Sequence, residues 1–442
     1  MSPLHRRQFL SATASAFGGF VLSGCRTSGA PLTLAGVTEV YGPLVPDPKG
    51  FLDLPEGFSY RLVSRLGDPM SDGGTVPDRA DGMGCLPLGD DEIVLIRNHE
   101  LQPQHEAGGT PAQGYDRVAG RAVLPGGTTH IVLDARTMET KREFRSLAGT
   151  IRNCSGGVTP WGSWLTCEEF VSESQHIGPD KLGRDHGWVF EVPVGATGLV
   201  NPAPLRAMGR FNHEAACVDP ATGYVYLTED RKDSVLYRFV PEVAGDLAKG
   251  GQLQAMRIKG LADTRNQGSA PMPVGKPYEV DWVTLDDVES PADDLRHRAA
   301  AAGAAIIARG EGIHMGTDEV FVCSTSGGAK ELGQVFKLVP GRGERPDTVE
   351  LFFESTDPAQ FNYGDNLTVG PNGHLIVCED QYTPVVDNYL RGITPGGQVY
   401  PFGRLRMQTE LAGGCFSPDG KWFFVNAYSP TRTFAITGPW AA

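Results

Sequence analysis

One pattern recurs six times along this chain of 442 residues. Each unit has a small or apolar strand, a turn rich in Pro, Gly and Asp, and an apolar strand that ends in polar residues. The units cover residues 86–99, 157–169, 216–230, 313–325, 367–380 and 415–427. Loosely equal units in such a series are typical of radial repeat folds, so we expect an all-β, six-bladed β-propeller. A pair of β-sandwiches is the alternative.

Composition favours strands over helices. The 57 Gly and 33 Pro residues predict many turns and few long helices. An Ala-rich stretch with interleaved Asp and Arg, residues 291–307, predicts one short helix in an insertion between blades. The net charge of −14 argues against a nucleic-acid partner.

The N-terminal part of the chain indicates export. Arg6 and Arg7 precede a mildly apolar run, which is typical of a twin-arginine signal over residues 1–24 and too short to span a membrane. Leu22 to Cys25 resemble a lipobox, so we expect a periplasmic lipoprotein whose only membrane contact is a lipid anchor at Cys25. Residues 25–48 predict an extended tether, and residues 49–442 the propeller domain.

Residue types that bind metals recur where the first strand of a unit begins. Four units have such a residue a few positions before the turn: Cys154, Glu214, Glu311 and Asp365. The other two units have Met83 and either Ala412 or Gly413 there. Because the innermost strands of a propeller begin around its channel, we expect a ring of the four side chains at one mouth.

Carboxylates also follow the second strand of several units. They are Glu168, Glu169, Glu229, Glu379 and Asp380. Both ends of a hairpin lie at the same sheet edge, so these acids belong to the same mouth; for any one of them, a solvated blade end is the alternative. The whole set would repel strongly without cations. Carboxylates suit calcium, and a thiolate among them favours a softer metal such as iron.

Three cysteines share one position beyond the turn, namely Cys167, Cys323 and Cys378, and we expect them to be small core residues. Cys154 alone occupies a ligand position. Arg309 lies two residues before Glu311, and residues at this spacing share a strand face. Arg309 could therefore bind phosphate beside a metal site. A salt bridge that only steadies Glu311 is the alternative.

Several motifs together resemble the PhoX family of bacterial alkaline phosphatases. They are RNHE at 97–100, RNCSGG at 152–157, TCEE at 166–169, FNHEAA at 211–216, RGEG at 309–312, and DNLTV with CED within 365–380, besides the twin-arginine leader. The resemblance implies a monomeric six-bladed propeller that holds iron and calcium at one end of the channel and hydrolyses phosphate monoesters.

The resemblance also implies roles for individual residues. It makes Cys154 an iron ligand, Glu214 and Glu311 metal ligands, and Arg309 the phosphate binder. The remaining acids would be calcium ligands: Glu168, Glu169, Asp365, Glu379 and Asp380. We therefore expect Arg309, Glu311 and Cys154 to carry the chemistry. A calcium-dependent propeller lactonase and a non-catalytic calcium-stabilised binding propeller are the alternatives.

Overall fold

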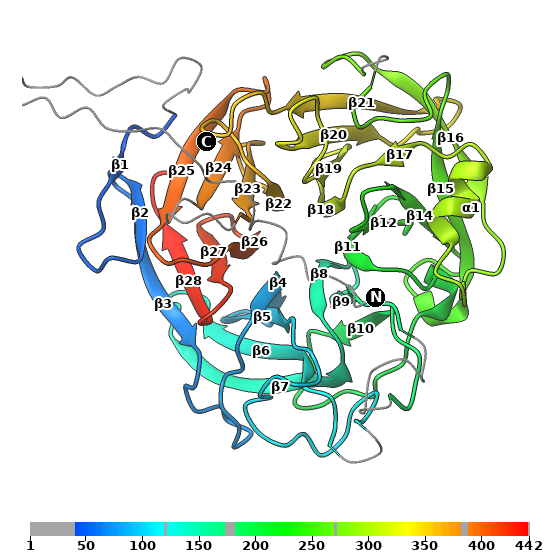
Figure 1. Ribbon diagram of the computed structural model, residues 1–442. Coiled ribbons are helices and arrows are strands. Elements are labelled where there is room, and N and C mark those ends of the chain that lie inside the picture. Colours follow the sequence, from blue (N-terminus) through cyan, green and yellow to red (C-terminus); the bar gives the residue numbers. More distant parts are fainter. Residues whose placement is uncertain (1–39, 119–121, 173–181, 269–271, 382–387, 441–442) are drawn as a thin grey trace, which may run out of the picture.

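A computed structural model describes residues 40–118, 122–172, 182–268, 272–381 and 388–440. Their regular structure is almost entirely β, and the strands are arranged like a propeller around a central axis (Figure 1). The predicted leader, Cys25 and the first part of the predicted tether lie outside these residues. No helix in the described ranges is long and apolar enough to cross a membrane.

Six antiparallel hairpins face the axis, one for each sequence unit. Their strands are β4 (Ala80–Leu88) with β5 (Glu92–His99), β8 (Asn153–Val158) with β9 (Ser163–Glu168), β11 (His213–Val218) with β12 (Val225–Glu229), β18 (Gly310–Met315) with β19 (Val320–Ser324), β22 (Gly364–Val369) with β23 (Leu375–Glu379), and β26 (Leu411–Phe416) with β27 (Trp422–Ala427). The first strands contact one another in the cyclic order β4, β8, β11, β18, β22, β26 and back to β4. The six hairpins predicted from the repeats are therefore present and form a closed ring.

Outer strands extend these hairpins away from the axis. They are β6 (Gly126–Asp134) and β7 (Thr140–Thr150); β10 (Val189–Pro193); β14 (Tyr237–Pro241), β15 (Gly251–Ile258) and β16 (Tyr278–Thr284); β20 (Gln334–Val339) and β21 (Asp347–Glu354); β24 (Tyr389–Ile393) and β25 (Val399–Leu405); and β28 (Arg432–Thr437). A two-stranded sheet joins β13 (Ser234–Val235) to β17 (Ile306–Ile307). The N-terminal strand β3 (Ser59–Arg65) pairs with β28 and so closes the ring between the two ends of the chain.

The prediction of six separate blades is not met by the sheets. Among the described residues, four sheets have four or more strands, one has three and one has two. One sheet has nine strands because β16 pairs with β21 and so joins two hairpin units. The hydrogen bonding confirms an all-β, propeller-like arrangement that is less regular than the repeats suggested.

Two further predictions are refined. The expected helix is shorter than its Ala-rich stretch: α1 covers Leu295–Ala301, and two 3₁₀ turns lie at Arg206–Met208 and Leu247–Lys249. The prediction of a tether is wrong for residues 40–48. Leu44–Val45 forms β1, which pairs with β2 (Leu52–Pro55), and Val40 and Tyr41 pack against a core cluster. Their apolar side chains favour burial over a solvated spacer.

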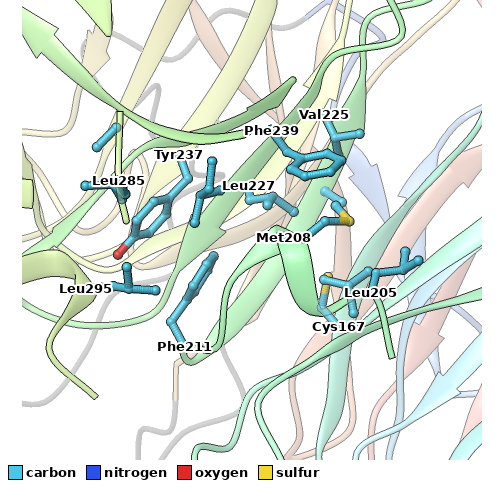
Figure 2. Packing of buried hydrophobic residues seen from close by; sticks show 14 of the residues in the cluster. Cys167, Leu205, Met208, Phe211, Val225, Leu227, Tyr237, Phe239, Leu285 and Leu295 are labelled. Carbon is cyan, nitrogen blue, oxygen red and sulfur yellow. The ribbon is translucent and has the colours of Figure 1, made fainter. Parts of the chain in front are cut away.

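The core lies between neighbouring sheets. One cluster combines Leu165 and Cys167 of β9 with Leu227 of β12 and Tyr237 of β14. Figure 2 shows Cys167, Leu227 and Tyr237 in this cluster together with Phe211 and Leu295. Full burial of such an apolar side chain contributes roughly 1.5–3 kcal/mol. Cys167, Cys323 and Cys378 are all fully buried in such clusters, which confirms their prediction as core residues.

Candidate metal centre

Each inner hairpin has a register irregularity at the same place. Near the start of the first strand, two residues face one residue of the second strand. Such a bulge bends the strand and redirects a side chain. The first residue of the six bulges is Asp81, Cys154, Glu214, Glu311, Asp365 and Gly413. Five of the six equivalent positions therefore carry a residue type that binds metals.

Asp81, and not Met83, is the member of this ring from the first hairpin. β4 and β5 are longer than the corresponding strands of the other units, with nine and eight residues. Counting back from the turn by the number of residues that fits the other units therefore ends at Met83, two residues after Asp81. Counting from the strand end would have found Asp81, because Ala80 pairs with His99 as Asn153 pairs with Glu168.

Two groups of three side chains could each hold a metal ion. One is Glu100, Cys154 and Glu169; the other is Glu214, Glu311 and Asp365. Within each group the ligand atoms lie within 4.8 Å of one another, and all six residues are buried. Five of these six residues were predicted from the sequence. The structure thus brings Cys154 and Glu169 together in one group, and three of the four ring carboxylates, Glu214, Glu311 and Asp365, together in the other.

Glu100 is the member that the sequence prediction missed. It follows β5 as Glu169 follows β9, and the two are held in the same way: the Glu100 N–H donates to the Arg79 carbonyl and the Glu169 N–H to the Arg152 carbonyl, both at 2.9 Å. A signal was present, because the Asn-His-Glu of residues 98–100 recurs at residues 212–214, where the glutamate is a ring residue.

Three predicted ligands, Glu168, Glu379 and Asp380, lie outside both groups. Glu168 accepts hydrogen bonds from His186 Nδ1 at 2.6 Å and from the backbone N–H of Gly187 at 2.9 Å. Glu379 forms an ion pair with Arg391 at 2.7 Å. Glu168 and Glu379 are each the last residue of a strand, and the residue that follows points the other way. The first acid of each pair therefore faces hydrogen-bond donors in its own sheet or next to it.

Asp380 follows Glu379 and belongs to neither group. Its backbone N–H donates to the Tyr363 carbonyl at 2.9 Å, which matches the hydrogen bonds that hold Glu100 and Glu169. Its Oδ1 atom is buried and has no hydrogen-bond partner among the described residues. Asp380 thus lies at the mouth in the position equivalent to Glu169.

Two arginines bridge carboxylates at the mouth. Arg152 contacts Glu100 through Nε at 2.7 Å and Glu169 through Nη2 at 2.7 Å. Arg309 contacts Asp230 through Nε at 2.8 Å and Glu311 through Nη2 at 2.9 Å. Arg309 and Glu311 therefore lie side by side as predicted, although Arg309 itself precedes the strand and has a φ of 51°.

The electrostatics of the mouth favour bound cations. Burial raises the pKa of Asp81 well above its usual range, and the nearby carboxylates of Glu100, Asp365 and Glu169 raise it further. Burial likewise raises the pKa of the Cys154 thiol, with Asp81, whose Oδ2 lies 3.5 Å from Cys154 Sγ, as the next largest cause. Metal ions would reverse this repulsion. Three buried carboxylates suit a hard cation, and a thiol with two carboxylates suits a softer one.

Glycines next to the ring allow neighbouring first strands to approach closely. A Cβ on Gly82, which follows Asp81, would lie 2.5 Å from the Ser155 Cα; one on Gly312, which follows Glu311, would lie 2.7 Å from the Asn366 Cα. Any larger residue would push these strands apart. The glycines therefore permit one metal group to draw ligands from separate hairpins.

A buried ion network lies beneath this mouth. His186 contacts Glu168 at 2.6 Å and Asp116 at 3.2 Å, and all three side chains are buried. Burial alone would lower the pKa of His186, but the two carboxylates outweigh it and raise the pKa to about 9. His186 is thus a cation at neutral pH, and Glu168 remains paired inside the fold.

Comparisons with a family model and with solved structures found similar proteins. A family model described as alkaline phosphatase PhoX matches residues 39–139 and 127–431. The solved structure of Pseudomonas fluorescens PhoX in complex with vanadate, a transition state analogue, is 19% identical, with 90% of this chain and 97% of that chain covered and a TM-score of 0.68. A gluconolactonase from Xanthomonas campestris is 13% identical over 90% of this chain and 98% of that chain, with a TM-score of 0.39. No protein with a curated description matches this chain.

The family match spans most of the chain, so the chain belongs to the PhoX alkaline phosphatase family. The protein is therefore an enzyme of the phosphatase class.

Proposed function

We propose that this enzyme hydrolyses phosphate monoesters at an iron and calcium centre in the mouth of its channel. The observation that carries the proposal is the pair of adjoining buried groups, one with a thiol and two carboxylates and the other with three carboxylates. This donor chemistry matches the two metals that the family resemblance implies.

We further propose that the fold is a six-bladed propeller with unequal blades. The closed cycle of six first strands supports this count, with each hairpin as the inner part of one blade. The irregular sheets arise from the outer strands: β16 links two blades, and the second hairpin has only β10 outside it.

The proposed ligands follow from the two groups. Glu100, Cys154 and Glu169 would hold iron, and Glu214, Glu311 and Asp365 would hold calcium. Asp81 lies between the groups, since its carboxylate contacts Cys154 and is close enough to Asp365 for charge repulsion. Asp380 would complete the calcium sites, while Glu168 and Glu379 keep the sheet edges in place.

When bound, the metal ions supply the positive charge that attracts a dianionic phosphate and the Lewis acidity that polarises its oxygens. The protein's own contribution comes from Arg309. Its planar guanidinium, held by Asp230 and Glu311, presents further N–H donors to equatorial phosphoryl oxygens. Ser155 is not needed as a nucleophile. Its hydroxyl accepts a hydrogen bond from Asn366 Nδ2 at 3.4 Å, which links neighbouring first strands.

The test is hydrolysis of p-nitrophenyl phosphate by the protein purified with its metals. Activity should be lost on chelation and return when iron and calcium are restored together. Glu311→Gln should abolish it, whereas the matched change Glu319→Gln on the outer end of the same hairpin should leave it unchanged. Hydrolysis of a lactone without hydrolysis of the phosphate ester would contradict the proposal.

We also propose that the enzyme is exported by the twin-arginine route and works in the periplasm as a monomer anchored by lipid at Cys25. The paired arginines and the lipobox-like sequence support this location. Cys25→Ala should move folded, active enzyme from the membrane to the soluble periplasmic fraction. Wild-type protein already in that soluble fraction would contradict the anchor.

A further inference from the structure

Three arginines occupy the same position in three of the repeats. Arg79, Arg152 and Arg309 each lie two residues before a ring residue, and their φ angles are 59°, 49° and 51°. This backbone conformation is uncommon for residues other than glycine. A backbone hydrogen bond stabilises this conformation in each case. The carbonyl of the arginine accepts from the N–H of the residue that follows the second strand of the hairpin, namely Glu100, Glu169 and Thr325 in turn. The fold therefore places three guanidinium groups around one mouth.

The three arginines differ in their charge partners. Arg152 and Arg309 each contact two carboxylates, so their charge is neutralised locally. Among the described residues, no carboxylate forms an ion pair with Arg79 within 4.0 Å. Its Nη1 donates to the Tyr428 hydroxyl at 3.0 Å, and its guanidinium lies 5.5 Å from the centre of the Tyr428 ring. Arg79 thus keeps a positive charge and several donors for another group.

Tyr428 connects Arg79 to the metal centre. Its hydroxyl donates to Glu100, which shares a group with Cys154 and Glu169. One phenolic hydroxyl therefore separates the Arg79 guanidinium from a proposed metal ligand. An anion held by Arg79 would be a near neighbour of a phosphate held at the metals.

Arg79 also lines a pocket of about 450 Å³. Its apolar walls include Leu66, Val76, Pro77 and Leu101, and Leu101 directly follows Glu100. His105 lies in the same pocket, and its Nδ1 accepts the Gln102 N–H at 3.0 Å, so Nε2 carries a proton. Asp78 and Glu106 also line the pocket, and the Asp78 carboxylate accepts hydrogen bonds from Ser429 Oγ and the Thr431 N–H. The pocket therefore adjoins the metal centre and offers the Arg79 guanidinium as a cation.

We propose that this pocket is the leaving-group subsite of the phosphatase, with Arg79 as its specificity-determining residue. It would receive the alcohol part of a phosphate monoester that carries a second anionic group, such as a carboxylate, and that group would contact Arg79. The inference rests on the proposed function. It adds the class of ester that the same site prefers.

The test compares two esters with the same three-carbon skeleton, 3-phosphoglycerate and glycerol 3-phosphate. The wild-type enzyme should have the higher kcat/KM for 3-phosphoglycerate. A hydrogen bond to a charged group implies that Arg79→Met lowers the ratio of the two kcat/KM values by about ten- to a hundredfold, mainly through KM. Arg79→Lys should restore part of the ratio, because it keeps the charge but not the planar donors.

Arg206→Met is the matched control, since Arg206 also lies over an aromatic ring, that of Trp188 at 5.1 Å, but outside the pocket. The ratio of the two kcat/KM values in Arg206→Met should equal that of the wild type. A wild-type ratio near one, or an equal loss on both esters in Arg79→Met, would overturn the inference while leaving the phosphatase proposal intact. Failure of the wild type to hydrolyse either ester would overturn the proposed function itself, and with it this subsite.

Discussion

Two consecutive glutamates at the end of β9 lie in different regions of the molecule. Glu168 and Glu169 are buried to the same extent, with exposed fractions of 0% and 1%. Glu168 turns into the sheet edge, where His186 and backbone N–H groups surround its carboxylate. Glu169 turns to the mouth, where it joins Glu100 and Cys154. Burial and charge therefore do not distinguish a structural acid from a candidate ligand; the groups around the carboxylate do.

The largest expected effect separates these two glutamates. Glu168→Gln should lower the free energy of unfolding by about 3 kcal/mol, because removing one partner of a buried ion pair leaves the charge of His186 with Asp116 as its one remaining carboxylate contact. Bound metal should be retained in the folded fraction. Glu169→Gln should instead lose metal and activity with a smaller loss of stability. Urea unfolding and elemental analysis of both variants check this, and the same outcome for both would remove the distinction.

The next effect concerns Arg309 at the mouth. Arg309→Ala should lower kcat by roughly 10²–10³-fold, as expected for a donor to the transition state, with metals still bound. The loss should fall on turnover and on inhibition by phosphate, measured by steady-state kinetics. If the variant keeps full activity with its metals in place, Arg309 is only the salt-bridge partner of Glu311.

Two buried cysteines test the same comparison. Cys154→Ser should lose iron and at least about a hundredfold in activity, the upper end of the cost of losing an outer-shell partner of a metal site. Cys323→Ser should keep both, and a hydroxyl without a partner in its apolar cluster should cost about 1–3 kcal/mol of stability. Iron content and thermal unfolding are the measurements. Loss of iron from both variants would contradict the assignment of Cys323 to the core.

The smallest effect is a pH dependence of stability. The pKa of His186 is about 9 in the folded protein, above its usual value of 6.5. The stabilisation of the folded state by protonated His186 is therefore complete below about pH 6.5 and is lost as the pH rises through 9. Tm should fall between pH 7 and pH 10 more steeply in the wild type than in Glu168→Gln, by differential scanning calorimetry. Parallel profiles would show that His186 is not charged in the folded state.

Much of the fold could be predicted from the sequence. The recurring strand, turn and strand pattern located all six inner hairpins, because each hairpin carries its own turn residues and apolar alternation. The outer strands lack such a repeated signal. The pairing of β16 with β21 depends on where the insertion after β15 places its chain, and this long-range contact has no local pattern.

The site could be predicted only in part, because residue spacing locates a side chain only where the hairpins are equally long. Residue spacing found Cys154, Glu214, Glu311 and Asp365, because their hairpins have similar lengths. It missed Asp81 and Glu100, since the longer β4 and β5 shift both ends of the first hairpin. Spacing also could not separate Glu168 from Glu169, because their partners, His186 and Arg152, lie outside the two strands of that hairpin.

The central claim is that the mouth holds iron as well as calcium, with Cys154 as the thiolate ligand. Elemental analysis of the enzyme exported in its native host tests it most directly, with Cys154→Ser and Cys323→Ser prepared alongside. The account predicts iron and calcium in the wild type and in Cys323→Ser, and calcium without iron in Cys154→Ser. Calcium alone in the wild type, or iron retained in Cys154→Ser, would contradict it.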